Sequence, residues 1–180
     1  NISMDEPYAA ICGISEDEIR SQMKEDVEGL AKKLEVPPEE ALMKLKENYD
    51  GYHFTYPSPD IYNPFSLLTA MEKGKIGSYW FGSGTPTYLI KMLDKFGVEP
   101  SEIGKKKAAV EDFDAPTERM TSIIPLLYQS GYITIKDYDE ELDLYTLDIP
   151  NKEVRIGLMK SLLPYYVASK APETNIMVAY

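Results

Sequence analysis

The apolar residues of this chain follow two different spacings, and that change constrains the fold more than any other feature of the sequence. Between Ile19 and Leu34, and in later stretches of the first hundred residues, they recur every three or four positions, the period of an α-helix. From residue 132 to 147 they alternate on either side of a turn at 139–141, which indicates a β-hairpin. Helical spacing returns after Asn151. We therefore expect a mainly α fold with a small α+β unit that contains one β-hairpin.

Polar residues and prolines at the ends of these stretches predict where the helices begin. Ser15 and Glu18 have the spacing of a capping box, in which each side chain accepts a hydrogen bond from the backbone N–H of the other. The other predicted starts combine a cap or a proline with the first turn: Pro37-Pro38, Asn63-Pro64, Thr85-Pro86 and Asn151. The predicted stops are Asp50-Gly51, Gly74 and Gly97.

The order of the elements predicts two units and a tail. Residues 1–112 are expected to form a helical domain that ends in a polar connector. Residues 113–170 carry a helix, the hairpin and another helix, which is the order found around the wing of a winged-helix unit. Pro125 must kink the first of these helices or begin a new turn. Residues 171–180 are expected to be a tail or the start of a following domain.

Composition excludes several classes of function. The 180 residues include 30 acidic and 19 basic side chains, so the net charge is −11, and we expect no direct contact with DNA. One cysteine and one histidine exclude an internal disulfide, a cysteine-rich zinc module and a histidine-rich metal site. No apolar run approaches the ~20 residues that a membrane span needs. We therefore expect a cytoplasmic protein that has no membrane contact and no cofactor in this chain.

Two stretches match the beginnings of catalytic motifs, and both fail on spacing. Residues 82–85 are rich in glycine, but a P-loop needs a lysine directly after its last glycine, and the next lysine is Lys91. Pro59-Asp60 could open a metal-dependent nuclease motif, but Glu72-Lys73-Gly74 has glycine where that motif needs lysine. We therefore predict no catalytic residue and no metal ligand, and interpret both stretches as turns.

The predicted hairpin is strongly acidic. Between Tyr132 and Asp148 six acidic side chains accompany a single basic one, Lys136. A wing of this charge repels phosphates, so we interpret it as a solvated edge that resists strand pairing. The triplet Lys105–Lys107 is too short to form a nucleic-acid site by itself.

Arg155 and Arg119 are the candidates for sensing a bound nucleotide. Arginine is suited to contacting the γ-phosphate of a nucleotide held by a neighbouring domain. Arg155 is expected on the first turn of the last helix and Arg119 in the helix before the hairpin, so either could lie at a domain junction. The alternative is ordinary surface pairing with the abundant carboxylates.

Tyr52, Tyr56 and Tyr62 are the candidates for an interaction surface. They crowd one irregular connection, and tyrosine is common in binding surfaces. The alternative, which we favour, is that these rings pack together and order the loop. His53 and Cys12 are interpreted as packed residues, because neither has a reactive partner beside it in the sequence.

The most distinctive segments of the chain occur in a fixed order along nearly its whole length. They are Asn1–Met4, Tyr8–Gly13, Tyr49–Phe54, Tyr62–Leu68, Ser83–Thr87, Leu127–Tyr132 and Pro150–Arg155. In this order they resemble the bacterial AAA-ATPase-like family, many of whose members also carry a C-terminal PD-(D/E)XK nuclease-like domain.

The resemblance implies that this chain is the middle of a longer protein. In the family, the P-loop and the acidic strand that holds Mg²⁺ precede the segment beginning at Asn1, and the nuclease-like domain follows near Tyr180. ATP and Mg²⁺ are therefore expected to bind the longer protein, whose N-terminal nucleotide-binding core and C-terminal domain are the expected partners. None of the family's catalytic motifs falls on a residue of this chain.

These observations predict a non-catalytic lid and coupling region that moves with nucleotide bound elsewhere in the same protein. The alternative is an interaction module that uses the tyrosine-rich loop or the winged-helix-like face. The acidity of the chain favours a protein partner over a nucleic acid for that module.

Overall fold

The structure is a computed structural model, and it describes residues 10, 12–80, 87–113, 115–116 and 120–169. The described helices are α1 (Glu16–Gln22), α2 (Lys24–Leu34), α3 (Pro38–Tyr49), α4 (Pro64–Lys73), α5 (Thr87–Phe96), the 3₁₀ turn η4 (Pro100–Glu102), α6 (Val110–Phe113), α7 (Ile124–Gln129) and α8 (Lys152–Ser169). The strands are β1 (Ile14–Ser15), β2 (Ile61–Tyr62), β3 (Lys106–Ala108), β4 (Thr134–Asp139) and β5 (Leu144–Asp148). This confirms the predicted mainly α fold with a small β unit.

The first four helices surround one hydrophobic cluster. Leu30, Leu45 and Leu67, from three different helices, are fully buried in it, together with the ring of Tyr49. Strands β1 and β2 close this cluster as an antiparallel pair. Because each short helix presents one apolar face, none buries its side chains alone, and packing together stabilises all four.

The predicted helix ends of this first unit are largely confirmed. The Ser15 hydroxyl accepts from the Glu18 N–H at 3.3 Å, and the Glu18 carboxylate accepts from the Ser15 N–H at 2.8 Å. Asn63 caps α4, and Gly74 ends it in the left-handed conformation, with φ of 63°. The stripe after residue 15 forms two helices, because Met23 leaves the helical conformation between them. The predicted start at Thr85-Pro86 lies outside the described residues.

A second hydrophobic cluster lies against a three-stranded antiparallel sheet. The predicted hairpin is confirmed as β4 and β5, with Ile135 opposite Leu147. The sheet also has a third strand that the sequence did not indicate: β3 pairs with β5, so the sheet order is β3-β5-β4. Residues 106–108, expected in a polar connector, become a strand because β5 offers them a free edge.

Along the chain the two clusters divide at the peptide between Tyr79 and Trp80, except that Tyr52 also packs against the second cluster. Tyr79 packs against the first cluster and Trp80 against the second. The buried residues of α5, together with Ile103 and Ala108, belong to the second cluster, although the sequence groups residues up to 112 with the first unit. Pro125 lies in the first turn of α7, so it begins a helix there.

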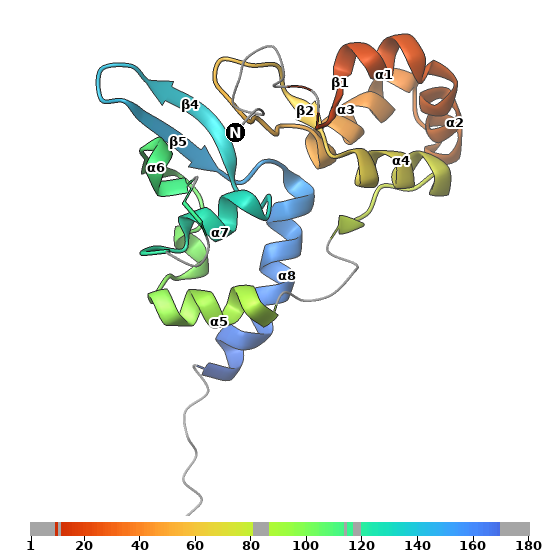
Figure 1. Cartoon of the computed structure of the whole chain (residues 1–180). Coiled ribbons are helices and arrows are strands. Elements are labelled where there is room, and N and C mark those ends of the chain that lie inside the picture. Colours follow the sequence, from red (N-terminus) through yellow and green to blue (C-terminus); the bar gives the residue numbers. More distant parts are fainter. Residues whose placement is uncertain (1–9, 11, 81–86, 114, 117–119, 170–180) are drawn as a thin grey trace, which may run out of the picture.

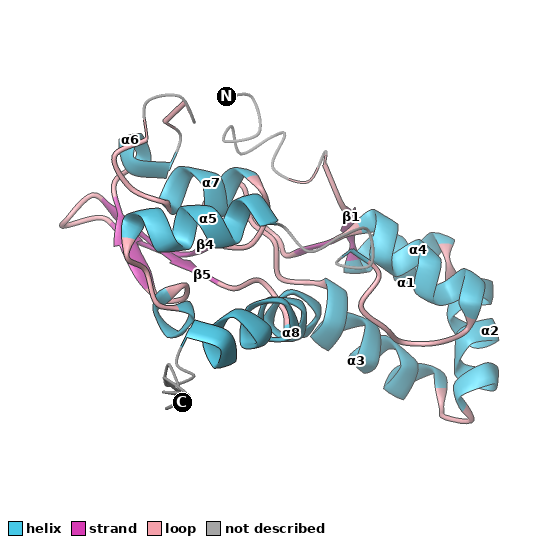
Figure 2. Cartoon of the chain, turned by 90° about the horizontal axis from the view of Figure 1, so that it is seen from below, coloured by secondary structure: helices cyan, strands magenta, loops and turns pink. Residues whose placement is uncertain are grey.

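Figures 1 and 2 show the arrangement of the two units. Helices α1 to α4 lie on one side, and α5, α6, α7 and the hairpin lie on the other. Helix α8 begins beside α3 and runs on against the second unit, so one helix contacts both. Among the described residues, no helix is long and apolar enough to cross a membrane.

Candidate functional site

The two units meet at a cluster of buried polar groups that we call the junction. It consists of Asp50, Gly51 and His53, which follow α3; Thr134 and Lys136 of β4; and Asn151 and Glu153 at the start of α8. Helix α3 ends at Tyr49, because Gly51, with φ of 92°, turns the chain away from the helical direction. The turn brings the chain directly against β4 and the start of α8.

Glu153 holds the point where the chain passes from one cluster to the other. Its side chain is 1% exposed, and its Oε1 accepts hydrogen bonds from the N–H groups of Tyr79, at 2.6 Å, and Trp80, at 3.0 Å. The same oxygen accepts from the hydroxyl of buried Ser66 on α4, at 2.9 Å. One carboxylate on α8 therefore binds three donors that belong to α4 and to the crossing segment.

The remaining junction contacts join the segment after α3 to the second unit. The Asn151 side chain caps α8 by accepting from the Val154 N–H at 3.1 Å, and its amide donates to the Asp50 carbonyl at 2.9 Å. The His53 N–H donates to the Thr134 hydroxyl at 2.8 Å, and that hydroxyl donates to the His53 carbonyl at 2.7 Å. Two side chains of the second unit thus satisfy backbone groups of the first.

Lys136 is partly buried in the junction, and its ammonium donates to two backbone carbonyls, those of Gly51 and Pro150. Burial lowers the pKa of this lysine, while the nearby charges of Asp60, Asp50 and Asp148 oppose that shift. A Cβ at Gly51 would lie 2.5 Å from the Pro150 carbonyl oxygen, so the close approach needs glycine. Lys136 therefore fixes to β4 both the segment that follows α3 and the segment that precedes α8.

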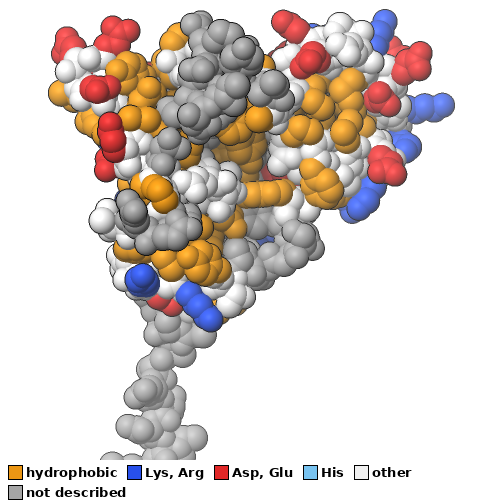
Figure 3. All heavy atoms as spheres, in the orientation of Figure 1, with side chains coloured by type: hydrophobic (Ala, Val, Ile, Leu, Met, Phe, Trp, Pro, Cys, Tyr) orange, Lys and Arg blue, Asp and Glu red, His pale blue; other side chains and the backbone are white. Residues whose placement is uncertain are grey.

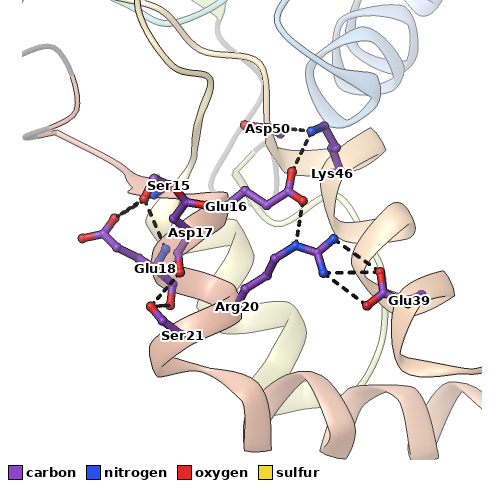
Figure 4. Close-up of polar contacts among 9 residues, drawn as sticks. All are labelled: Ser15, Glu16, Asp17, Glu18, Arg20, Ser21, Glu39, Lys46 and Asp50. Carbon is purple, nitrogen blue, oxygen red and sulfur yellow. Dashed lines mark hydrogen bonds and ion pairs between the residues drawn. The ribbon is translucent and has the colours of Figure 1, made fainter.

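Asp50 is buried beside the junction with an incomplete set of partners. Its Oδ1 has no hydrogen-bond partner among the described residues, and its Oδ2 lies 3.9 Å from the Lys46 ammonium. Figure 4 shows why the lysine is shared: Lys46 also contacts Glu16, at 2.7 Å. Burial raises the pKa of Asp50 to about 6, and the charge of Asp60 adds to this effect. Asp50 is therefore a carboxyl group that the fold holds readily in its protonated form.

His53 makes two side-chain contacts in the loop that follows the junction. Its Nε2 lies 2.6 Å from Oδ1 of Asp60, and its Nδ1 lies 3.0 Å from the hydroxyl of Ser58. The His53 hydrogen bond holds the pKa of Asp60 below its usual range. The sequence predicts a packed His53 with no partner beside it, because these contacts form only when the loop closes on itself.

A groove lies between the units next to the junction. Its volume is about 270 Å³, and the rings of Tyr52, Trp80 and Tyr128 line it together with the polar side chains of Asn63 and Thr134. Hydrophobic side chains also gather between the two units on the face drawn in Figure 3. The tip of the hairpin on the same face carries acidic side chains, as its composition predicts.

The structure places the predicted interaction residues in three different environments. Tyr62 is 1% exposed and belongs to the first core, so packing rather than binding explains it. Tyr52 is half-buried and hydrogen-bonded to Asn63 and Asn151, and burial raises its pKa. Tyr56, at 37%, is the exposed member of the three.

The predicted sensor residues are only partly described. Arg155 is exposed on the first turn of α8, where it lines a cavity of about 470 Å³ together with Lys105 and Asp148. Arg119 lies outside the described residues. Arg155 is two positions from Glu153, so the first turn of α8 carries both a residue that lines this cavity and a residue of the junction.

Sequence reasoning missed the central junction residues, Glu153, Lys136 and Asp50. Glu153 follows a predicted helix start and reads as an ordinary first-turn acid, and Asp50 reads as part of a helix stop. One signal was available in the sequence. Glu153 directly precedes Val154, which belongs to the core-facing stripe of α8, so a buried position for Glu153 could have been considered. No group of three or more potential metal ligands occurs within the described part of the chain.

Comparison with known proteins gives one relative and no function. The chain is 29% identical over 176 residues to the "Uncharacterized protein in vnfD 5'region" of Azotobacter chroococcum mcd 1. The match covers 95% of this chain and 31% of the relative, so the chain spans about a third of that protein's length. No family model and no solved structure matches the chain.

Proposed function

We propose that this chain is the lid and coupling region of a longer, cytoplasmic AAA-ATPase-like protein. The resemblance of its ordered segments to that family supports this proposal, and so does the relative, which is about three times as long as the matched stretch. The P-loop and the nuclease-like motifs are absent from the sequence of this chain. Nucleotide chemistry is therefore assigned to other parts of the longer protein.

The order of elements in the second unit supports a winged-helix-like fold for it. Helix α5, strand β3, helices α6 and α7, and the hairpin follow one another in the sequence. Winged-helix units have this order of helix, strand, two helices and two strands, with the first strand beside the third, as in β3-β5-β4. On this assignment, the unit begins at α5, and the β4–β5 turn is its wing.

The observation that carries the coupling role is the connection of α8 to both units. Arg155 is exposed, whereas Glu153, two residues earlier, is buried and binds Ser66, Tyr79 and Trp80. In this proposal, a contact with Arg155 displaces the start of α8, and Glu153 transmits that displacement to the first unit. Packed side chains, hydrogen bonds and rigid helices of this kind can carry coupling between distant sites.

Exposed apolar side chains of α8 support the presence of a further domain. Met159 and Leu163 are 66% and 64% exposed, and they line a cavity of about 660 Å³ together with Pro100. Exposed apolar surface of this kind is typical of an interface. We assign it to the C-terminal domain of the longer protein, and we assign the cavity beside Arg155 to the ATP·Mg²⁺-binding core.

The test uses the complete protein encoded by the reading frame that contains this chain. We expect the complete protein to hydrolyse ATP, and Arg155→Ala to lower turnover by roughly 10³-fold, as for a residue that contacts the γ-phosphate. Lys91→Ala, which removes an exposed charge from α5, should leave turnover unchanged. Equal effects of the two substitutions, or ATP hydrolysis by the 180-residue chain alone, would overturn the proposal.

The groove favours a second candidate function, a protein-interaction module. Its aromatic lining and neutral polar groups match the usual composition of an interface centre. None of the described residues that line the groove is charged, so a partner bound there would be held with little dependence on salt.

A further inference from the structure

The loop after the junction brings a hydroxyl, an imidazole and a carboxylate into line. Ser58 lies 3.0 Å from one ring nitrogen of His53, and Asp60 lies 2.6 Å from the other. A nucleophile within hydrogen-bonding reach of a base, with the base oriented by a third group, is the arrangement that activates serine. Here the hydroxyl faces Nδ1 and the carboxylate faces Nε2.

The base of this arrangement is held rigidly. The backbone of His53 exchanges two hydrogen bonds with the Thr134 hydroxyl on β4, and the imidazole is only 11% exposed. Pro57 and Pro59 flank Ser58 and restrict the backbone on both sides of it. The geometry is therefore set before any reagent binds, as an activated nucleophile requires.

The charges also suit proton transfer from the serine. Asp60 is hydrogen-bonded to His53 and lies near the ammonium groups of Lys136 and Lys46, so it remains ionised. An ionised Asp60 accepts the proton on Nε2, which leaves Nδ1 of the neutral ring free to accept from Ser58. The Ser58 hydroxyl also lies 2.9 Å from the Thr55 carbonyl, to which it donates when Nδ1 carries the proton.

Access to the hydroxyl completes the arrangement. Ser58 is half-exposed, and the Asp60 side chain is 45% exposed, so a small reagent reaches the loop from solvent. We propose that Ser58 is an activated serine that accepts an acyl group from an ester, with His53 as the base and Asp60 as the group that orients it.

The reaction is a single acyl transfer and is independent of the proposed coupling function. Ser58 Oγ forms a bond to the carbonyl carbon of the ester, and His53 Nδ1 takes the hydroxyl proton. The bond from the carbonyl carbon to the alcohol oxygen breaks, and the alkoxide or phenolate leaves with that electron pair. The product is an O-acylated Ser58, so the site is assigned as a modification site.

The test treats the 180-residue chain with p-nitrophenyl acetate and locates the acetyl group by peptide mapping. We expect peptide mapping to find an acetyl group on Ser58, and no acetylation at that position in Ser58→Ala. His53→Gln should slow acetylation of Ser58 by about 100-fold, the size of a general-base effect. A purely structural contact between Ser58 and His53 would not make the rate of acetylation depend on the imidazole.

Exposed Ser101 of η4 provides the matched control, because it has no imidazole beside it in the structure. Ser101→Ala should react as the unchanged chain does, and the melting temperature of each variant shows whether it has folded. If His53→Gln proves unfolded, Asp60→Asn replaces it, with a smaller loss of rate expected. The proposal would be overturned if Ser58 were acetylated no faster than Ser101. It would also be overturned if Ser58 were acetylated at the same rate in the unchanged chain and in the folded His53 or Asp60 variant.

Discussion

At the scale of single residues, the junction contains a carboxyl group whose surroundings favour its neutral form. Asp50 is 3% exposed, Lys46 is shared with Glu16, and burial raises the pKa of Asp50 to about 6. In the unfolded chain the same group titrates near 4, its ordinary range. Between these values the folded chain binds more protons, so the free energy of unfolding falls as pH rises through about 6.

The substitution Asp50→Asn removes this titration and keeps the size of the side chain. We expect the variant to be more stable than the unchanged chain at pH 7 by about 1–3 kcal/mol, and the difference to shrink towards pH 4. Urea unfolding at several pH values between 4 and 8 measures it. A variant that is less stable at pH 7, or a difference that does not change with pH, would contradict the assignment.

At the scale of elements, helix α8 depends on a cap that also bridges the two units. Asn151 accepts from the Val154 N–H and donates to the Asp50 carbonyl. We expect Asn151→Ala to lower the free energy of unfolding by about 2–3 kcal/mol, because it removes a cap and leaves a buried carbonyl without its donor. Ser15→Ala removes an exposed cap and should cost only about 1 kcal/mol. Thermal unfolding measures both, and equal losses would show that the bridge contributes nothing.

The elements also show how far sequence reasoning reaches. Helix ends at Ser15, Asn63 and Asn151 were predictable because capping is a local interaction between residues three positions apart. The hairpin was predictable from its alternating pattern. Strand β3 was not, because three residues beginning with two lysines carry no periodic pattern, and their strand conformation comes from pairing with β5, almost 40 residues later in the sequence.

The candidate site was less predictable than the fold for the same reason. Junction contacts join residues far apart in the sequence, as Ser66 and Glu153 do, 87 positions apart. A buried acid and an exposed acid look alike in a sequence, and only the packing of both units shows that Glu153 is buried. The tyrosine candidates illustrate the limit: one crowded loop places Tyr62 in the core and Tyr56 at the surface.

At the scale of the whole molecule, a coupling role requires the two hydrophobic clusters to behave as one mechanical unit. The clusters divide between Tyr79 and Trp80, and the carboxylate of Glu153 binds the N–H groups of both residues. Without that carboxylate two backbone donors and the Ser66 hydroxyl lose their acceptor, which costs about 3 kcal/mol or more. Each cluster keeps its own hydrophobic core, so removing the carboxylate weakens the connection between the clusters rather than either core.

Denaturant unfolding observed by two probes tests this claim most directly. Trp80 is the only tryptophan and packs against the second cluster, so its fluorescence reports that unit, whereas far-ultraviolet circular dichroism reports the helices of both. We expect coincident transitions for the unchanged chain and for Glu153→Gln, which keeps an acceptor oxygen, and separate transitions for Glu153→Ala. Separate transitions in the unchanged chain, or coincident ones in Glu153→Ala, would contradict a coupling role for this junction.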